Sequence, residues 1–340
     1  MRVLHAPAEI AGQASILTAA LRDLGVEAHS LAYNSGFPQY KPDEALPYDD
    51  RPPLPRYLGY LRTLLRHAGR YDIVHFHFGR TLIPPHNFDL PLHRMLGARV
   101  VFHYHGCDVR NREHMRATHA RATCTECDPF CHPARQRRIL ASARHYANAE
   151  LVSTPDLLES APRAQHLPVA ARLADYPLRI PAGPAKLVLH APTNRLIKGT
   201  RHVEAAFERL RPRFPHVRFE TVEKLPWTEL RDRLAEADVV VDQLFMGWYG
   251  MVAVEAMACG KPVLCFIRPD FESRLHGCPI VRCGIETLED RLAALLESPD
   301  QRRECGEQGR AYVIREHGAQ VVAERLLALY RAIEEAPANA

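Results

Sequence analysis

Short segments rich in β-branched residues alternate with amphipathic helical segments along most of this 340-residue chain. Such alternation predicts α/β domains, in which helices cover both faces of a parallel sheet. In the first half we expect strands at residues 2–5, 27–32, 73–78, 99–104, 150–153 and 165–167. A second series is expected at residues 187–191, 217–222, 239–242 and 263–266. The pattern therefore predicts two consecutive βα domains that flank a cleft.

Residues 168–184 separate the two series and contain four prolines and one glycine, which is typical of a linker. We place an N-terminal domain at residues 1–170, the linker at 171–185 and a second domain at 186–318. The last helical stretch, within residues 319–340, is expected to cross back to the first domain. Ligands of parallel sheets bind beyond the carboxyl ends of the strands, so functional residues are sought there.

Charge and hydrophobicity exclude several classes of protein. The net charge of +4 is too small to indicate a nucleic-acid partner. Apolar stretches are far shorter than the roughly 20 residues of a transmembrane helix. The first residues reach Gly12 too soon for the core of a signal peptide, so we expect a cytoplasmic protein whose nine cysteines are largely reduced.

The segment from Gly247 to Val263 carries the most chemical information. Gly247 and Gly250 predict a tight turn that opens a helix, with free backbone N–H groups and the positive end of the helix dipole facing a ligand. A diphosphate suits such a helix start. Glu255 falls about one turn into the helix, where its carboxylate can accept both hydroxyls of a ribose. The alternative is an ordinary βαβ unit whose glycines only form turns.

Two cations, Arg195 and Lys198, lie where the first strand of the second domain passes into a helix. Fixed cations at that place can neutralise a leaving diphosphate. The chain has only five lysines, so a lysine followed by glycine at a helix start favours function. The alternative is a solvated loop.

Together these segments resemble the donor-binding domain of GT-B glycosyltransferases, specifically the retaining group called family 4. The resemblance rests on Arg195…Lys198-Gly199 and on the run Glu255-Ala-Met-Ala-Cys-Gly-Lys-Pro262. It implies two Rossmann-like domains facing a central cleft, and metal-independent transfer of a sugar from a UDP- or GDP-sugar with retention of configuration. It implies no further cofactor. The acceptor is left open among a glycan, a lipid-linked molecule and a small molecule.

The resemblance also implies a donor site. Its expected members are a diphosphate clamp (Arg195, Lys198, Gly247 and Gly250), a ribose ligand (Glu255) and a base-binding loop (Val222 and Leu225).

Further site residues are implied on both domains. His105 and Asp108, in a His-Gly-Cys-Asp run that resembles the family's His-Gly-Ser-Asp, would contact the sugar or the acceptor as catalytic residues. Gly12, Asp242 and Tyr249 are weaker candidates, because they lie in or beside expected β-to-α turns.

Gly247 departs from the family pattern, which places a second Glu eight positions before Glu255. This departure leaves open whether transfer retains or inverts configuration. It also leaves two other functions open: a nucleotide-sugar 2-epimerase of the same architecture, and a non-catalytic nucleotide-binding partner protein.

The run Cys124, Cys127, Cys131 and His132 offers three thiolates and an imidazole, which is a set that a structural zinc ion can use. The alternative is a loop with free thiols. The helix that follows carries Arg135, Arg137, Arg138 and Arg144. It could touch anionic lipid in a peripheral membrane contact, or it could simply be a solvated helix face.

Overall fold

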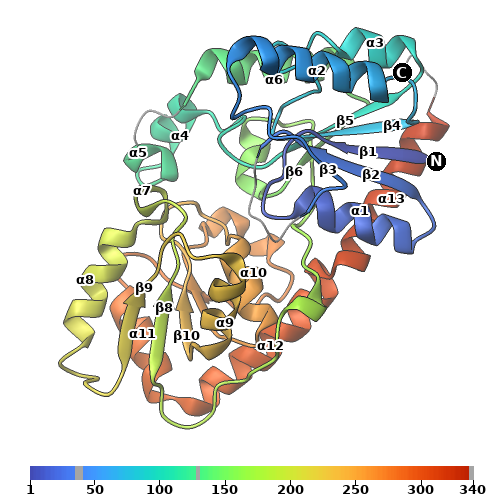
Figure 1. Cartoon of the computed structure of the whole chain (residues 1–340). Helices are drawn as coiled ribbons and strands as arrows, with labels where there is room; N and C mark the ends of the chain where they lie inside the picture. Colours follow the sequence, from blue (N-terminus) through green and yellow to red (C-terminus); the bar gives the residue numbers. More distant parts are fainter. Residues whose placement is uncertain (35–40, 128–130, 337–340) are drawn as a thin grey trace. The chain divides into compact units, whose positions relative to one another are not determined.

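The computed structural model describes residues 1–34, 41–127 and 131–336. The chain forms two compact units (Figure 1). Unit 1 comprises residues 1–111, 131–170 and 319–340, and unit 2 comprises residues 112–130 and 171–318.

Unit 1 contains a seven-stranded sheet whose paired strands are all parallel, in the order β3-β2-β1-β4-β5-β6-β7. Its strands are β1 (Arg2–Ala6), β2 (Glu27–Ala32), β3 (Glu44–Ala45), β4 (Ile73–His77), β5 (Arg99–Tyr104), β6 (Ala149–Val152) and β7 (Gln165–His166). The central strands β4 and β5 are buried almost throughout, although they carry His75, His77 and His103 among their apolar residues.

Helices cover both faces of this sheet. They are α1 (Gln13–Asp23), α2 (Pro53–His67), α3 (Leu90–Met95), α6 (Pro133–Tyr146) and α13 (Ala319–Glu335). One hydrophobic cluster joins α2, α3 and α6 to one face, whereas a second cluster joins α1 and α13 to the other. The C-terminal helix α13 thus belongs to unit 1, where Val322 and Leu326 are fully buried.

Unit 2 contains a five-stranded parallel sheet in the order β12-β11-β10-β8-β9. Its strands are β8 (Leu187–His190), β9 (Arg218–Thr221), β10 (Val239–Val241), β11 (Val263–Cys265) and β12 (Val281–Arg282). Its helices are α4 (Arg112–Thr118), α5 (Thr123–Glu126), α7 (Arg195–Lys198), α8 (Thr200–Leu210), α9 (Trp227–Glu236), α10 (Met251–Ala258), α11 (Leu288–Glu297) and α12 (Pro299–His317). The predicted α/β class with two parallel sheets is confirmed.

Residues 112–130 pack with unit 2, although their position in the sequence falls within the expected N-terminal domain. Polar contacts explain the difference, because Arg201 reaches Glu126 at 2.8 Å and Arg268 reaches His119 at 3.0 Å. Sequence patterning could not reveal this, since the segment contains only two short helices. Among the described residues, no helix is both long enough and apolar enough to cross a bilayer.

Candidate functional site

In unit 2, the segment after β8 brings a lysine to the carboxyl edge of the sheet. Asn194 caps α7, because its Oδ1 accepts hydrogen bonds from the N–H groups of Leu196 and Ile197 at 3.0 and 3.1 Å. Lys198 ends this single helical turn. Gly199 then adopts a φ of 71°, which lets the chain turn directly into α8.

Asp242 joins Lys198 to the start of α10. The Lys198 Nζ lies 3.2 Å from Asp242 Oδ1 and 2.6 Å from Gln243 Oε1. The other oxygen of Asp242 accepts a hydrogen bond from the Gly250 N–H at 2.7 Å. The three side chains are buried. An ammonium group and a helix N-terminus therefore converge on one point, and Asp242 links them.

Gly250 permits this convergence through its size. A Cβ at position 250 would lie 2.9 Å from the Lys198 Nζ. The structure thus brings Lys198, Asp242 and Gly250 together, although their assignment to a diphosphate stays a prediction.

Arg195 is not part of this buried group. Its guanidinium is exposed and pairs with Glu204 at 2.5 Å and with Glu223 at 2.8 Å. Those two contacts raise the pKa of Arg195. Exposed ion pairs of this kind contribute only about 0–1 kcal/mol, so Arg195 can exchange its partners for another anion at little cost.

Glu255 lies on α10 and is buried. Its Oε1 accepts hydrogen bonds from the Tyr176 hydroxyl and from the Trp227 indole N–H, both at 3.0 Å. The two rings meet edge to face, with their centroids 5.9 Å apart. Two neutral donors therefore fix the carboxylate that the sequence assigns to a ribose.

The expected base-binding loop follows β9. The Val222 N–H donates to the His190 carbonyl at 2.9 Å, and both Val222 and Leu225 are half-buried. Trp227, also half-buried, opens α9 directly after this loop. The loop is thus continuous in the chain with Trp227, which is one of the two donors to Glu255.

Gly247 has a structural reason to be glycine. Its φ is 76°, and a Cβ there would lie 2.6 Å from both Cγ and Cδ of Arg268. The Arg268 N–H also donates to the Gly247 carbonyl at 3.0 Å, while its guanidinium lies 4.1 Å from the centre of the Phe271 ring. The side chain of Arg268 therefore occupies the space that a glutamate at position 247 would need.

Tyr249 does not join the group around Lys198. Its buried hydroxyl bonds to the Tyr312 hydroxyl at 2.8 Å and to the His317 Nε2 at 3.0 Å. Its ring stacks on Trp248. These contacts assign Tyr249 to packing against α12.

A cavity of about 110 Å³ lies beside α7. Its lining includes Arg195, Gly199 and Phe245, together with Glu126 of α5. Sites for drug-sized ligands measure about 300–1,000 Å³, so this cavity alone does not accommodate a nucleotide sugar.

In unit 1, the half-buried His105, directly after β5, continues a row of buried histidines on β1 and β4. The His5 Nδ1 lies 3.0 Å from the His77 Nε2, and the His77 Nδ1 lies 3.0 Å from the His105 Nε2. The His105 Nδ1 lies 2.6 Å from the Ser153 Oγ. Burial lowers the pKa of His5 and of His105 to about 3, so both rings are neutral.

One tautomer satisfies the whole row. If each Nδ1 carries the proton, His5 donates to His77, His77 to His105 and His105 to Ser153. The Ser153 hydroxyl then donates to the Tyr104 carbonyl at 3.1 Å. Both ring nitrogens of His105 are therefore engaged within unit 1. For His105 to form a hydrogen bond with a substrate, one of these two bonds must break.

Tyr330 of α13 completes the row at its other end. Its hydroxyl lies 2.5 Å from the His75 Nδ1 and 3.3 Å from the His5 Nε2. In the same tautomer set, His75 donates to Tyr330 and Tyr330 donates to His5. The C-terminal helix is thus bonded to the strands that carry the histidines.

Asp108 is buried in the turn after β5. Its carboxylate accepts hydrogen bonds from the backbone N–H groups of Gly106 at 2.7 Å and of His105 at 3.2 Å. Desolvation raises its pKa to about 6, although these bonds and Arg110 oppose the rise. The Asp108 carboxylate therefore holds the turn together. It takes up a proton near pH 6.

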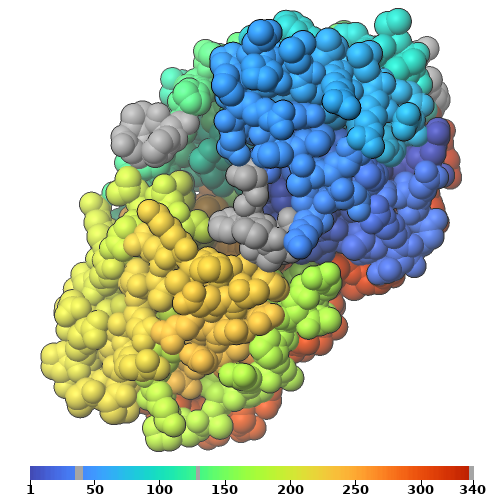
Figure 2. Space-filling view, viewed as in Figure 1, coloured from blue at the N-terminus to red at the C-terminus, as the bar shows by residue number. Residues whose placement is uncertain are grey.

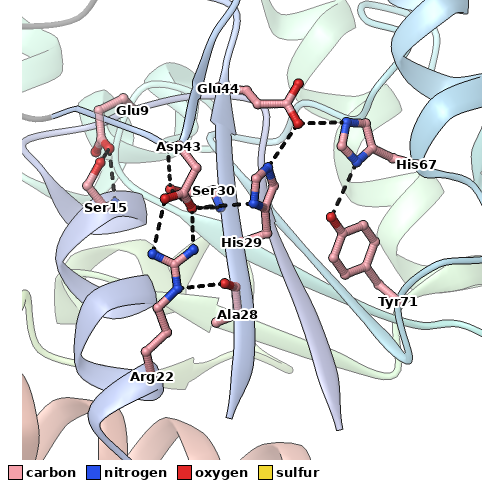
Figure 3. A network of polar contacts seen from close by, with 10 residues as sticks. All are labelled: Glu9, Ser15, Arg22, Ala28, His29, Ser30, Asp43, Glu44, His67 and Tyr71. Carbon is pink, nitrogen blue, oxygen red and sulfur yellow. Dashed lines mark hydrogen bonds and ion pairs between the residues drawn. The ribbon is translucent and has the colours of Figure 1, made fainter.

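Gly12 adopts a φ of 79° at the start of α1. Glu9 already caps this helix, because its carboxylate accepts hydrogen bonds from the N–H groups of Ala14 at 3.2 Å and Ser15 at 3.0 Å. Figure 3 shows Glu9 beside Ser15. The anion position that the sequence suggests near Gly12 is thus taken by a side chain of the protein.

The expected zinc ligands fall in different units. Cys124 and Cys127 belong to unit 2, whereas Cys131 and His132 belong to unit 1. Zinc at this run stays a prediction. Among the described residues, the imidazole groups that do lie within 4.8 Å of one another belong to unit 1: His5, His75 and His77, and His77, His103 and His105.

Sequence reasoning missed Tyr176, Trp227 and Arg268. Tyr176 lies in the expected linker, and Arg268 lies 21 residues after Gly247. Trp227 could have been suspected, because it directly follows the expected base loop and is one of only two tryptophans.

Comparison with known proteins identifies the class. Residues 191–328 match the family described as glycosyl transferase-like. A search of curated proteins found no match.

The whole chain resembles several solved structures. Sucrose-phosphate synthase from Thermosynechococcus elongatus is 15% identical with a TM-score of 0.65, covering 99% of this chain and 100% of that one. A TarM variant from S. aureus, crystallised with UDP, is 14% identical with a TM-score of 0.56, covering 81% of this chain and 59% of that one. UDP-GlcNAc 2-epimerase from Neisseria meningitidis is 13% identical with a TM-score of 0.59, covering 98% of this chain and 100% of that one. At these identities the likeness shows the fold.

The fold is GT-B, and the C-terminal part of the chain carries a glycosyltransferase domain. The chain is therefore a glycosyltransferase of the GT-B class. Membership of family 4 stays a prediction.

The steric account of Gly247 predicts the stability of Gly247→Ala. Gly25 has a similar φ of 80° with no atom within 4 Å of its missing Cβ, so Gly25→Ala measures the backbone cost alone. We expect Gly247→Ala to lose about 1–3 kcal/mol more than Gly25→Ala in urea unfolding, because it also clashes with Arg268. Adding Arg268→Ala should recover part of that excess. Equal losses in the two single variants would contradict the account.

The histidine row predicts acid sensitivity. The pKa of His5 and His105 falls from 6.5 to about 3 on burial, so the unfolded chain binds more protons between these values. Stability should be complete above about pH 6.5 and should fall with decreasing pH by roughly 1.4 kcal/mol per pH unit for each such histidine. Asp108 offsets the contribution of one histidine below about pH 6, because its pKa is raised and its carboxyl group binds a proton more readily in the folded chain. Urea unfolding at pH 7.5, 6.0 and 5.0 measures the slope, and a flat profile would show that the rings are not buried as neutral groups.

Proposed function

We propose that this glycosyltransferase uses a nucleoside-diphosphate sugar, UDP- or GDP-linked, as donor and a hydroxyl group as acceptor. The observation that carries the proposal is the convergence of the Lys198 ammonium and the Gly250 N–H at the start of α10. A diphosphate can accept a hydrogen bond from the ammonium, and it can accept one from the Gly250 N–H when it takes the place of the Asp242 carboxylate that accepts from this N–H in the structure.

The charge at this point is balanced by Asp242. Gln243 holds the Lys198 Nζ at 2.6 Å, and Asp242 holds it at 3.2 Å, so the ammonium is fixed before a ligand arrives. Such preorganisation means that the group need not reorient when negative charge develops on the leaving diphosphate. Arg195 supplies a second cation, because its exposed carboxylate partners are readily exchanged.

Glu255 supports the nucleotide end of the proposal. Tyr176 and Trp227 both donate to its Oε1, which orients the carboxylate on α10. A carboxylate fixed in this way can accept hydrogen bonds from the two ribose hydroxyls. We assign the base to the loop of Val222 and Leu225, beside the half-buried indole of Trp227.

In the proposed reaction, the bond between the anomeric carbon and the diphosphate oxygen breaks, and the nucleoside diphosphate leaves with the electron pair. The acceptor oxygen bonds to the same carbon and passes its proton to the departing diphosphate oxygen. Lys198 and the α10 N-terminus stabilise the leaving charge, and we extend the proposal to transfer without a metal and with retention. We also propose that His105 and Asp108 lie near the sugar or the acceptor. The same proposal includes a cytoplasmic location for the protein.

The proposal is tested by incubating the full chain with UDP- and GDP-hexoses and a panel of glycan, lipid-linked and small hydroxyl acceptors. We expect release of nucleoside diphosphate together with a glycosylated acceptor, and NMR of the anomeric proton gives its configuration. Interconversion of the donor at C2 without acceptor would instead identify an epimerase. Donor binding without turnover across the whole panel would identify a non-catalytic binder.

Glu255→Gln tests the ribose assignment. Gln keeps an Oε1 that can accept from Tyr176 and Trp227, so the fold should be retained. We expect calorimetry to show that UDP or GDP, whichever the wild type prefers, binds about tenfold or more weakly, since hydrogen bonds to charged groups contribute about 1.5–3 kcal/mol. The wild type should bind the 2′-deoxy nucleotide more weakly than the ribonucleotide. This difference in affinity should be smaller in the variant. Glu208→Gln, which changes an exposed carboxylate on α8 outside the proposed donor site, is the control, and equal affinity in all three proteins would remove the assignment.

A further inference from the structure

Helix α2 of unit 1 presents an apolar stripe to solvent. Leu54, Leu58, Leu61 and Leu65 recur every three or four residues and are 47–73% exposed. The opposite side of the helix is anchored, because Tyr60 and other residues of α2 pack into the core of unit 1. The stripe is therefore a fixed outward surface. Figure 2 shows α2, in medium blue, on the outside of the molecule.

The apolar surface extends beyond α2. Phe88 is 71% exposed, Met95 is 82% exposed and Leu96 is 48% exposed. Among the described residues, eight of the eleven exposed large hydrophobic side chains lie between residues 54 and 96. Scattered apolar residues need no explanation, but such a concentration on one unit indicates an interaction surface.

The same side of the sheet is strongly basic. Helices α2, α3 and α6 pack on one face, seen together on one side of unit 1 in Figure 1. None of the three contains an Asp or Glu. Together they carry eight arginines: Arg56, Arg62, Arg66, Arg94, Arg135, Arg137, Arg138 and Arg144.

The arginines and the apolar residues adjoin one another. Arg138 of α6 contacts His86 at 3.2 Å, and the ring of His86 stacks on the exposed Phe88. Arg94 of α3 bonds to the carbonyl of His145 on α6 at 3.3 Å. In the described part of the chain, Arg66 is the member of the eight that forms an ion pair, with Glu44.

From this geometry we infer that the α2–α3–α6 face docks on a membrane surface rich in anionic lipid. Leucine and phenylalanine side chains enter the boundary between headgroups and acyl chains, while arginines bind the lipid phosphates. A second copy of the chain is a poorer occupant. Pairing this face with itself would bring two arginine-rich surfaces together with no helix carboxylate to compensate them.

The test uses the full-length chain in flotation with vesicles of phosphatidylcholine alone or mixed with phosphatidylglycerol. We expect binding to the mixed vesicles, little binding to the neutral ones, and weaker binding as salt rises. Leu58→Ser with Leu61→Ser should reduce the affinity about tenfold or more, since two partly inserted apolar side chains are lost.

The matched control is Leu178→Ser with Ile314→Ser. These side chains are 54% and 48% exposed, close to the 58% and 47% of Leu58 and Leu61, but they lie in unit 2. The control should bind like the wild type. Arg137→Gln with Arg138→Gln should weaken binding at low salt and much less at high salt.

Three results would overturn the inference. The first is that the wild type fails to bind mixed vesicles. The second is that the Leu58/Leu61 variant and its control bind equally well. The third is that the wild type forms a dimer that does not bind vesicles and that the Leu58/Leu61 variant disrupts. The last result would assign the face to a second copy. Unfolding curves of each variant verify folding, and vesicle binding needs no donor, so it can fail or succeed independently of sugar transfer.

Discussion

In unit 2, the turn that leads into α10 depends on one buried ion pair, between Lys198 and Asp242. Burying the pair without further hydrogen bonds would destabilise the fold, because two charges are removed from water. The pair is retained in a network: Gln243 also binds the ammonium, and the Gly250 N–H binds the free oxygen of Asp242. The side chain of Gln243 in turn donates to the Trp248 carbonyl, so the turn before α10 and the lysine after β8 are held by the same residues.

This network explains two glycines of the turn in different ways. Gly250 is small because Lys198 approaches it, whereas Gly247 has a left-handed backbone and faces the stem of Arg268. The side chain of Arg268 thus fills the space at position 247, where the predicted family pattern places a glutamate. In unit 1, neutral side chains join the central strands. Its histidines exchange hydrogen bonds through Tyr330 and Ser153, which ties the C-terminal helix to the strands.

Local patterning was enough to predict the parallel α/β fold and the helix of Glu255, because buried parallel strands and their helices have distinct periodicities. It failed where contacts are remote in sequence. The two-residue strands β3 and β12 carry too few residues for a pattern. The family resemblance placed Lys198 and Gly250 in one clamp. It could not reveal that Asp242 joins them, that Arg195 pairs with surface glutamates, or that both nitrogens of His105 are occupied.

We propose above all that Lys198 and the start of α10 bind the second phosphate of a nucleotide. This claim is tested most directly by calorimetry with the nucleoside mono- and diphosphate of one base, on the wild type and on Lys198→Met. We predict that the diphosphate binds the wild type at least about tenfold more tightly than the monophosphate, since charge-assisted hydrogen bonds are strong. This ratio should approach one in Lys198→Met. An undiminished ratio in a folded variant would contradict the claim.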